Sequence, residues 1–507
     1  MNNLISDVYK SMLLRTIDYY IINSKGDIFK VKTKQSKALC KQQKGHFMSK
    51  DINKTILATT SLGAFIPPFM VSSVNIAMPT ISNEFALNST MLNWIPLSYT
   101  LLMAIFVLPY GRLADIMGRK KVLLFGVALF VLSSLLCAAA INPTMLIIAR
   151  VLQGTGSAAI SVTVVSILTS VFPAGSRGKA LGLNVAMTYI GLSTGPYLGG
   201  LMVKYFGWRS IFLFVSAVGI IVIIALFRIK QDWAESEGEK LDIVGSTIFG
   251  LALIGIIMGF SAIMEPVGLW LILAGIALIF VFVYYENKIS QPILNISLLK
   301  NNRVIVFSSL AALLNYSATF ALSYLMSLYL QYVKGFEPSR AGLILIAQPA
   351  VMAALSPLAG LLSDKFEIQK VASLGMAITT LGLSFFMFLN QGTSIYYIIF
   401  ALIILGLGFA LFSSPNTNAV MGAVDKRYYG ITSGILSVSR TIGQTFSMGL
   451  ASMIISIYIG NEPMSHNIPQ LLLSMKTVFT IMTVLCFVGI FASLARSGFK
   501  HQRNNSE

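Results

Sequence analysis

Charged side chains are scarce in this chain of 507 residues, where Asp, Glu, Lys and Arg together make up only 11%. A typical soluble domain carries roughly 25% charged residues. Hydrophobic residues make up 55% of the sequence, and its mean hydropathy is +0.77. This balance excludes an ordinary soluble protein and indicates that much of the chain lies in a lipid bilayer.

Cysteine and histidine are nearly absent as well. Cys40, Cys137 and Cys486 are far apart, and the three histidines lie outside the apolar stretches, so the sequence has no disulfide framework and no metal-ligand cluster. It also lacks a Gly-x-x-x-x-Gly-Lys-Ser/Thr loop, the usual nucleotide-binding motif. We therefore expect no metal, no cofactor, no nucleotide and no enzymatic activity.

The apolar residues fall into fourteen stretches that contain almost no charge. Because a helix rises about 1.5 Å per residue and the hydrocarbon core is about 30 Å thick, roughly 20 apolar residues cross a bilayer. We predict membrane-spanning helices near residues 55–78, 92–111, 122–141, 144–168, 180–203, 210–227, 243–263, 267–285, 304–328, 341–362, 371–390, 394–417, 431–458 and 475–495. The chain is therefore predicted to be an all-α polytopic membrane protein with 14 transmembrane helices.

The basic residues predict the orientation of these helices, since cytoplasmic loops retain Lys and Arg. With the N-terminus inside, only four of the 37 Lys and Arg fall on the outer side: Lys204, Arg209, Lys334 and Arg340. We expect a multi-pass protein of the cell membrane with both termini in the cytoplasm. A basic face beside anionic lipid explains the net charge of +18, so we expect no nucleic-acid partner.

Residues 1–54 carry eleven Lys or Arg and no apolar run of signal-peptide type, which predicts a basic cytoplasmic segment. Two interpretations stay open for its first part. Translation starts at Met48, which gives the chain a short cytoplasmic lead, or residues 1–47 form a real basic tail.

An internal duplication is visible once the stretches are numbered. The run from Gly111 to Asp115 recurs as the run from Gly360 to Asp364, eight helices later. Glycines repeat at identical spacing at 178, 182 and 191 and at 430, 434 and 443. We predict an amino-terminal six-helix bundle at 55–230, inserted helices 7 and 8 at 231–300, a carboxy-terminal six-helix bundle at 301–495 and a cytoplasmic tail at 496–507. Such repeats pack around a cavity at the middle of the membrane.

The loop Gly-Arg-Leu-Ala-Asp-Ile-Met-Gly-Arg-Lys-Lys at 111–121 resembles the signature between helices 2 and 3 of the major facilitator superfamily, and the chain after Met48 is similar to its fourteen-helix drug:proton antiporter branch. The resemblance implies the major facilitator fold, with two six-helix bundles plus two inserted helices. It also implies that this loop is a conformational lock. The residues we assign to the lock are Gly111, Arg112, Asp115, Gly118 and Arg119.

The helix at 180–203 contains Gly191, Gly195, Pro196 and Gly199, and this run is similar to the antiporter motif of the same family. Glycines four apart let a neighbouring backbone approach closely, and proline removes one helical hydrogen bond. Two interpretations stay open, since small residues also serve ordinary helix packing. The Gly-Pro pair favours the antiporter interpretation.

Two arginines lie inside predicted spans. Arg150, with Gln153 and Gly154, looks like the Arg-Gln-Gly motif of the family. Its side chain either extends to the headgroups, or it orders a cavity or shifts the pKa of a coupling group. Arg440 lies nine residues into its helix, roughly 13 Å from the cytoplasmic face, and therefore needs a polar partner or a wet cavity. We regard Arg150, Gln153, Gly154 and Arg440 as candidates for coupling or for the cavity.

Several amide side chains also fall within spans, and for each of them a place in the cavity and a hydrogen bond between helices are equally compatible with the sequence. Asn75 and Gln348 are our cavity candidates among them. Tyr99, Asn184, Asn315, Asn416 and Gln444 are further polar residues of this kind.

Carboxylates are missing from the middle of every predicted span. Relatives that export cationic drugs often carry an aspartate early in helix 1, and Met70 takes that place here. A buried acid is the simplest proton carrier and the simplest counter-ion for a cation. We therefore predict neutral or anionic amphiphilic substrates, with coupling through a helix-end acid such as Asp115 or Asp242, or through the substrate's own proton.

The resemblance implies a transporter that exports small amphiphilic molecules by alternating access, with proton antiport and without ATP. Its expected partners are a small-molecule substrate, protons and the lipid bilayer, and the sequence makes no prediction about a periplasmic adaptor. Two alternatives stay open: a metabolite importer or facilitator, and a membrane sensor that binds a ligand without moving it.

Overall fold

The computed structural model describes residues 20–22, 28–30, 50–172, 174–234, 238–263, 265–289, 292–294, 302–423, 429–460 and 462–496. Most of the predicted basic segment 1–54, including Met48, and all but the first residue of the predicted tail 496–507 lie outside these residues. The chain forms two compact units, Met1–Lys54 and Thr55–Glu507. In the first unit, strands β1 (Tyr20–Ile22) and β2 (Ile28–Lys30) pair antiparallel.

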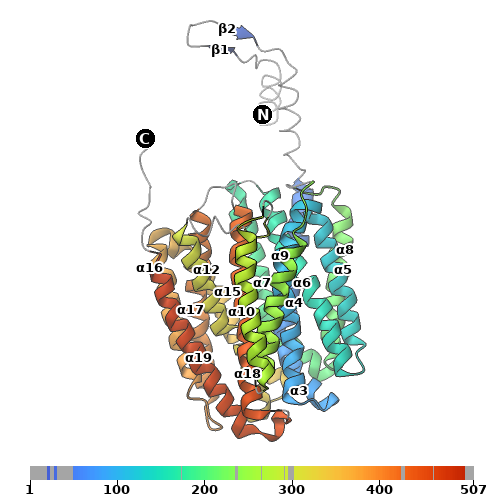
Figure 1. Cartoon of the computed structure of the whole chain (residues 1–507), viewed down its shortest axis with the longest axis vertical. Helices are drawn as coiled ribbons and strands as arrows, with labels where there is room; N and C mark the ends of the chain where they lie inside the picture. The colour runs from blue at the N-terminus through green and yellow to red at the C-terminus, as the bar shows by residue number, and fades with distance from the viewer. Residues whose placement is uncertain are drawn as a thin grey trace, which may run out of the picture. The chain divides into compact units, whose positions relative to one another are not determined.

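Helices make up the second unit and run side by side in Figure 1. The first six, all in the amino-terminal half, are α3 (Lys50–Phe85), α4 (Ser89–Met117), α5 (Arg119–Ala138), α6 (Pro143–Val171), α7 (Ala174–Phe206) and α8 (Arg209–Arg228). Two more follow, α9 (Ile243–Ser261) and α10 (Pro266–Glu286). The rest are α12 (Arg303–Thr319), α13 (Leu322–Leu328), the π-helical turn η1 (Tyr329–Val333), α14 (Pro338–Leu345), α15 (Ala347–Lys365), α16 (Ile368–Phe386), α17 (Ile395–Gly422), α18 (Tyr429–Ile459), the short turn η3 (Met464–His466) and α19 (Ile468–Leu494).

Within the described residues, 13 helical segments are long and apolar enough to cross a membrane. The fourteenth predicted span corresponds to α7, whose Gly, Ser, Thr and Pro residues keep it below that level of hydropathy. The prediction of an all-α fold with membrane-spanning helices is confirmed.

Two predicted spans are interrupted. The span predicted at 304–328 extends to Val333 as α12, α13 and η1, and the one at 341–362 is divided between α14 and α15. The second division has a local cause in Pro349, because a proline ring clashes with the carbonyl four residues earlier, which belongs to Leu345 at the end of α14.

The two halves pack in the same way. In the amino-terminal half, α6 packs against α4 and α5, and α5 also packs against α8; in the carboxy-terminal half, α17 packs against α15 and α16, and α16 also packs against α19. Each helix of the second set lies eight predicted spans after its counterpart. The predicted duplication therefore appears as two bundles with equivalent helix contacts.

The inserted helices α9 and α10 pack mainly against each other, and α9 also contacts α4 and α18. Those two helices also pack against each other, so α9 lies beside a seam between the bundles. The residue boundaries that we drew at 230 and 300 remain predictions.

The end of the bundles where α4 passes into α5 carries most of the described basic side chains, and we call it the basic end. We call the other end of the bundles the opposite end, and there hydrogen bonds and an ion pair join the two bundles. Ser89 N donates to Glu462 O at 3.3 Å, and Gln331 Nε2 donates to Ile76 O at 3.0 Å. Lys204 Nζ lies 2.7 Å from Glu337 Oε2. These contacts close the opposite end.

Close backbone packing reinforces this contact between α7 and α14. A Cβ added to Gly342 of α14 would lie only 1.9 Å from Pro196 O of α7, and one added to Gly200 would lie 2.6 Å from Pro338 O. Only residues without a side chain permit these approaches. The bundles therefore touch through backbone as well as through side chains.

Candidate functional site

A cavity of about 340 Å³ lies between the two bundles. Its wall comes from both halves of the chain: α3, α4, α6 and α7 on one side, and α12, α13, α14, α15, α17 and α18 on the other. Most lining side chains are apolar or aromatic, and amides at Asn75, Asn184, Gln348 and Gln444 add polar groups. A mostly apolar cleft with a few polar groups is typical of a small-molecule site.

Arg440 is the only charged residue among the described residues that line the cavity. Its Nη2 donates to Thr417 Oγ1 at 2.6 Å, and its guanidinium lies 5.8 Å from the centre of the Tyr316 ring. Its buried Nε has no hydrogen-bond partner in the structure. Because a guanidinium has five N–H donors, Arg440 has donor capacity left for a ligand.

Tyrosines from both bundles face the same space. Tyr189 OH of α7 lies 3.4 Å from Ser413 Oγ of α17, which joins the two bundles across the cavity. Tyr316 packs edge-on against Phe409, with their ring centres 5.3 Å apart. Sequence reasoning missed Tyr189, Tyr316 and Thr417, and a hydroxyl inside an apolar span was the only signal for them.

Arg150, Gln153 and Gly154 come together inside the amino-terminal bundle and do not line the cavity. The Arg150 side chain is only 1% exposed, which excludes extension to the headgroups. Its Nε donates to Ile95 O at 3.2 Å, its Nη1 donates to Gln153 Oε1, and Gln153 Nε2 bonds to Ser134 Oγ at 2.6 Å.

Arg150 still reaches the cavity indirectly through Tyr99. Its guanidinium stacks 4.2 Å from the centre of the Tyr99 ring, which lines the cavity. The Tyr99 hydroxyl donates to Ser157 Oγ at 2.6 Å. A Cβ on Gly154 would lie 2.3 Å from Tyr99 O, so this glycine permits the contact between α4 and α6. Arg150 thus supports the cavity wall from behind.

The glycines of α7 pack against α3. A Cβ on Gly191 would lie 2.6 Å from Phe65 O, and Cβ atoms on Gly195 and Gly199 would meet Ser72 and Ser73. Pro196 lines the cavity beside them. Close packing of the glycine run is therefore present, and the antiporter role of this helix remains a prediction.

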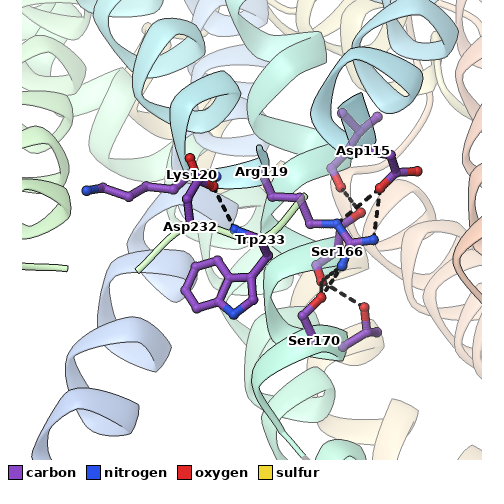
Figure 2. Close-up of polar contacts among 9 residues, drawn as sticks. Asp115, Arg119, Lys120, Ser166, Ser170, Asp232 and Trp233 are labelled. Carbon is purple, nitrogen blue, oxygen red and sulfur yellow. Dashed lines mark hydrogen bonds and ion pairs between the residues drawn. The ribbon is translucent and has the colours of Figure 1, made fainter. Parts of the chain in front are cut away.

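The predicted lock residues make their described bonds within the amino-terminal half and to the segment after α8. Asp115 Oδ1 accepts from Arg119 Nη2 at 2.8 Å, and Arg119 Nη1 donates to Ser166 O at 3.2 Å (Figure 2). Arg112 forms an ion pair with Glu239. Gly118 has a φ of +109°, which favours glycine. Gly111 has open space around it. The locking role remains a prediction.

The segment after α8 forms hydrogen bonds with the start of α5, as Figure 2 shows. Arg119 N donates to Trp233 O at 2.9 Å, and Lys120 N donates to Asp232 Oδ1 at 2.9 Å. The Asp232 carboxylate lies directly beside Gly118, 2.5 to 2.7 Å from where a Cβ would be. The sequence did not predict Asp232, Trp233 and Glu239, because residues of a long polar loop give no sign of which other loop they contact.

The described helices, arranged as two similarly packed bundles around a shared cavity, define a multi-pass membrane transporter. The model of the Major Facilitator Superfamily matches residues 60–337 and 308–507. The chain belongs to this superfamily, whose members are transporters and not enzymes, and the predicted membership is confirmed.

The similar proteins include drug exporters and also a riboflavin transporter. Multidrug resistance protein Stp of Mycobacterium tuberculosis is 31% identical over 426 residues, which cover 80% of this chain and 77% of Stp. Drug efflux pump JefA of the same species is 30% identical over 423 residues, covering 80% of this chain and 81% of JefA. Riboflavin transporter RibZ of Clostridioides difficile is 27% identical over 446 residues, covering 87% of this chain and 96% of RibZ.

Solved structures agree on the fold. The inward-facing, occupied structure of a bacterial homologue of the human lysosomal transporter Spinster superposes with a TM-score of 0.64 at 16% identity, covering 89% of this chain and 98% of that one. The nucleoside transporter NupG superposes with a TM-score of 0.60 at 12% identity, covering 88% and 100%.

Proposed function

We propose that this protein exports small amphiphilic molecules across the cell membrane by alternating access, as a secondary active antiporter that exchanges its substrate for protons. The observation that carries the proposal is the cavity, because both bundles line it and a rocking motion would expose it to one side at a time. The similarity to multidrug resistance protein Stp and to drug efflux pump JefA supports export of foreign compounds.

The basic end faces the cytoplasm in this proposal, and both termini lie on that side. The bonds from Ser89 to Glu462 and from Lys204 to Glu337 close the opposite end. The structure then corresponds to an inward-facing state that takes up substrate from the cytoplasm. Export requires these contacts to break while the basic end closes, where the lock at Arg112, Asp115 and Arg119 would act.

Arg440 sets the charge of the substrate. A cation with an unpaired N–H group attracts a carboxylate, phosphate or carbonyl oxygen and repels another cation. Among the described lining residues there is no Asp or Glu to balance a cationic drug. Neutral and anionic amphiphiles are therefore the proposed substrates, held by the aromatic wall and oriented by Arg440.

A second candidate function is transport of a metabolite, and RibZ supports it because this riboflavin transporter matches over 96% of its own length. A flat, mostly neutral heterocycle fits the same description as the proposed substrates. The same cavity would serve either function, and the direction of coupled transport distinguishes them.

Transport by purified protein in liposomes tests the proposal. A pH gradient, acidic inside, should drive a neutral or anionic dye into vesicles that contain the protein with its basic end outward. Arg440→Ala should lose uptake of the anionic dye, while the exposed Arg340→Ala serves as a matched control that removes the same charge outside the cavity. Dye uptake at the same rate with and without the pH gradient would refute proton antiport.

A further inference from the structure

Two carboxyl groups are buried together in the inserted helices. Asp242 immediately precedes α9 and is 7% exposed, and Glu286 is the last residue of α10 and is 3% exposed. Asp242 Oδ1 accepts from Gly245 N at 2.9 Å, and Glu286 Oε2 accepts from Leu294 N at 3.0 Å. The other oxygen of each group, Asp242 Oδ2 and Glu286 Oε1, is buried and has no donor in the structure.

These two unpartnered oxygens face the same point. A Cβ added to Gly245 would lie 2.2 Å from Asp242 Oδ2 and 2.6 Å from Glu286 Oε1. The absence of a side chain at Gly245 therefore leaves room for the two carboxyl groups to approach each other. Two ionised carboxylates cannot lie so close in a buried site unless a cation or a proton compensates them.

One titratable group, the Tyr285 hydroxyl, contacts the pair, and several charged groups lie nearby. On α10, Tyr285 OH lies 3.4 Å from Asp242 Oδ1, and Lys288, just beyond the helix, bonds to Tyr284. Lys240, two residues before Asp242, is exposed. On the helices packed against α9, Arg112 and Asp115 of α4 pair with Glu239 and Arg119, and Arg440 of α18 bonds to Thr417. Lys288, Arg112 and Arg440 therefore bond to other groups. No described side chain donates to Asp242 Oδ2 or Glu286 Oε1.

We propose that Asp242 and Glu286 form a proton-binding site that holds one proton between Asp242 Oδ2 and Glu286 Oε1. The proton is taken up reversibly from water at the basic end and leaves the same way, so a carboxylic acid and a carboxylate face each other while it is bound. Loss of the proton leaves two negative charges in contact and drives α9 and α10 apart at this end.

The position of the pair gives its proton a structural consequence. Glu286 Oε2 accepts a hydrogen bond from Leu294 N, and Leu294 precedes α12 of the carboxy-terminal bundle in the chain. Helix α9 packs against both α4 and α18. Separating the pair would loosen the inserted helices from both bundles. The site therefore makes the arrangement of the bundles sensitive to the pH on the basic side, and it does not itself carry a proton across the membrane.

Infrared difference spectroscopy of the full-length protein in liposomes tests for the shared proton. The wild type should show a protonated-carboxyl C=O band that disappears as the pH rises. Glu286→Gln should lack the band, because its amide replaces the acid and donates to Asp242 permanently; Asp242→Asn is a second variant with the same expectation. Glu265→Gln, at the exposed start of α10, is the matched control and should keep it. A band unchanged in both pair variants overturns the proposal.

Thermal unfolding gives an independent readout that does not require transport. A proton held more tightly in the folded protein than in the unfolded chain stabilises the fold at low pH, and that stabilisation is lost as the pH rises. Between about pH 5 and about pH 9, the melting temperature of the wild type and of Glu265→Gln should fall more steeply than that of Glu286→Gln. Equal slopes, or stabilisation by Na⁺ with no C=O band, would overturn the proposal. Proton antiport would be untouched by that result.

Discussion

Arg440 is the residue on which the proposed substrate selectivity depends. Its removal deletes a charge-assisted hydrogen bond to a bound anion, an interaction worth about 1.5–3 kcal/mol, so Arg440→Ala should weaken binding of an anionic ligand about tenfold or more. Binding of a neutral ligand of similar shape should change much less. Equilibrium binding of both ligands to detergent-purified protein measures the two effects. An equal loss of affinity for both ligands would show that Arg440 shapes the cavity but does not select ligands by charge.

Arg150 should behave differently, because it lies behind the cavity wall. Arg150→Ala removes a large buried side chain and leaves Gln153 and the Ile95 carbonyl without their partner, so we expect a loss of roughly 2–4 kcal/mol in unfolding free energy. Thermal unfolding of this variant beside the exposed Lys370→Ala measures it. A melting temperature equal to that of Lys370→Ala would contradict a supporting role.

For single residues, the sequence predicted how deep a side chain lies along its helix but did not predict which side chains it contacts. An arginine nine residues into an apolar helix predicts a polar partner or a wet cavity; Arg440 bonds to Thr417 and lines the cavity. Arg150 left two interpretations open because helix position does not say which face of the bundle a side chain meets. Its stacking on Tyr99 depends on how α4 and α6 pack, which the spacing of residues along one helix does not encode.

Among the helices, α7 and α14 form a contact that only glycine permits. A valine at Gly342 places its side chain against the Pro196 carbonyl, so Gly342→Val should separate the bundles at the opposite end. Spin labels at the exposed positions Tyr205 and Leu343 report that separation by pulsed electron resonance. Gly434→Ala is the control, because no atom of a neighbouring residue lies within 4 Å of its added Cβ. An unchanged distance distribution in Gly342→Val would show that this contact does not hold the end closed.

The segment after α8 should detach when its anchor is removed. Asp232 caps the start of α5 by accepting from Lys120 N, and loss of such a cap costs about 1 kcal/mol. Asp232→Ala should therefore speed amide hydrogen exchange at Arg119, Lys120 and Trp233, whereas Glu367→Ala at the start of α16, where no side-chain cap bond is present, should not. Exchange that is unaltered in Asp232→Ala would mean that the segment is held by its other contacts.

The positions of the helices followed from hydropathy, but their exact boundaries and their interruptions did not: α3 continues past the predicted end at 78 to Phe85, and α19 begins at Ile468 and not at 475. The break before Ala347 is explained by Pro349, which the sequence displays, whereas the π-helical turn at Tyr329–Val333 continues an apolar run with no local signal. The pairing of Asp242 with Glu286 was likewise hidden, because residues 44 positions apart meet only after α9 and α10 pack around Gly245.

For the whole molecule, the repeat of glycine and aspartate motifs predicted two bundles, and the equivalent helix contacts in each half agree with it. The orientation predicted from Lys and Arg and the boundaries of the bundles remain predictions. Which end of the bundles is joined was beyond sequence reasoning, because it depends on contacts such as Ser89 with Glu462 that connect distant parts of the chain. An alternating transporter must break and remake such contacts in every cycle.

Proton movement in energised inside-out vesicles tests the proposed antiport most directly. A pH-sensitive dye inside the vesicles reports the proton gradient while cationic, neutral and anionic amphiphiles are added in turn, with and without the protein. We predict that neutral or anionic compounds dissipate the gradient only when the protein is present, and that Arg440→Ala abolishes the response to the anionic ones. A gradient that no compound dissipates, while labelled compounds still accumulate in the vesicles, would contradict proton antiport; a response confined to cations would contradict the role of Arg440.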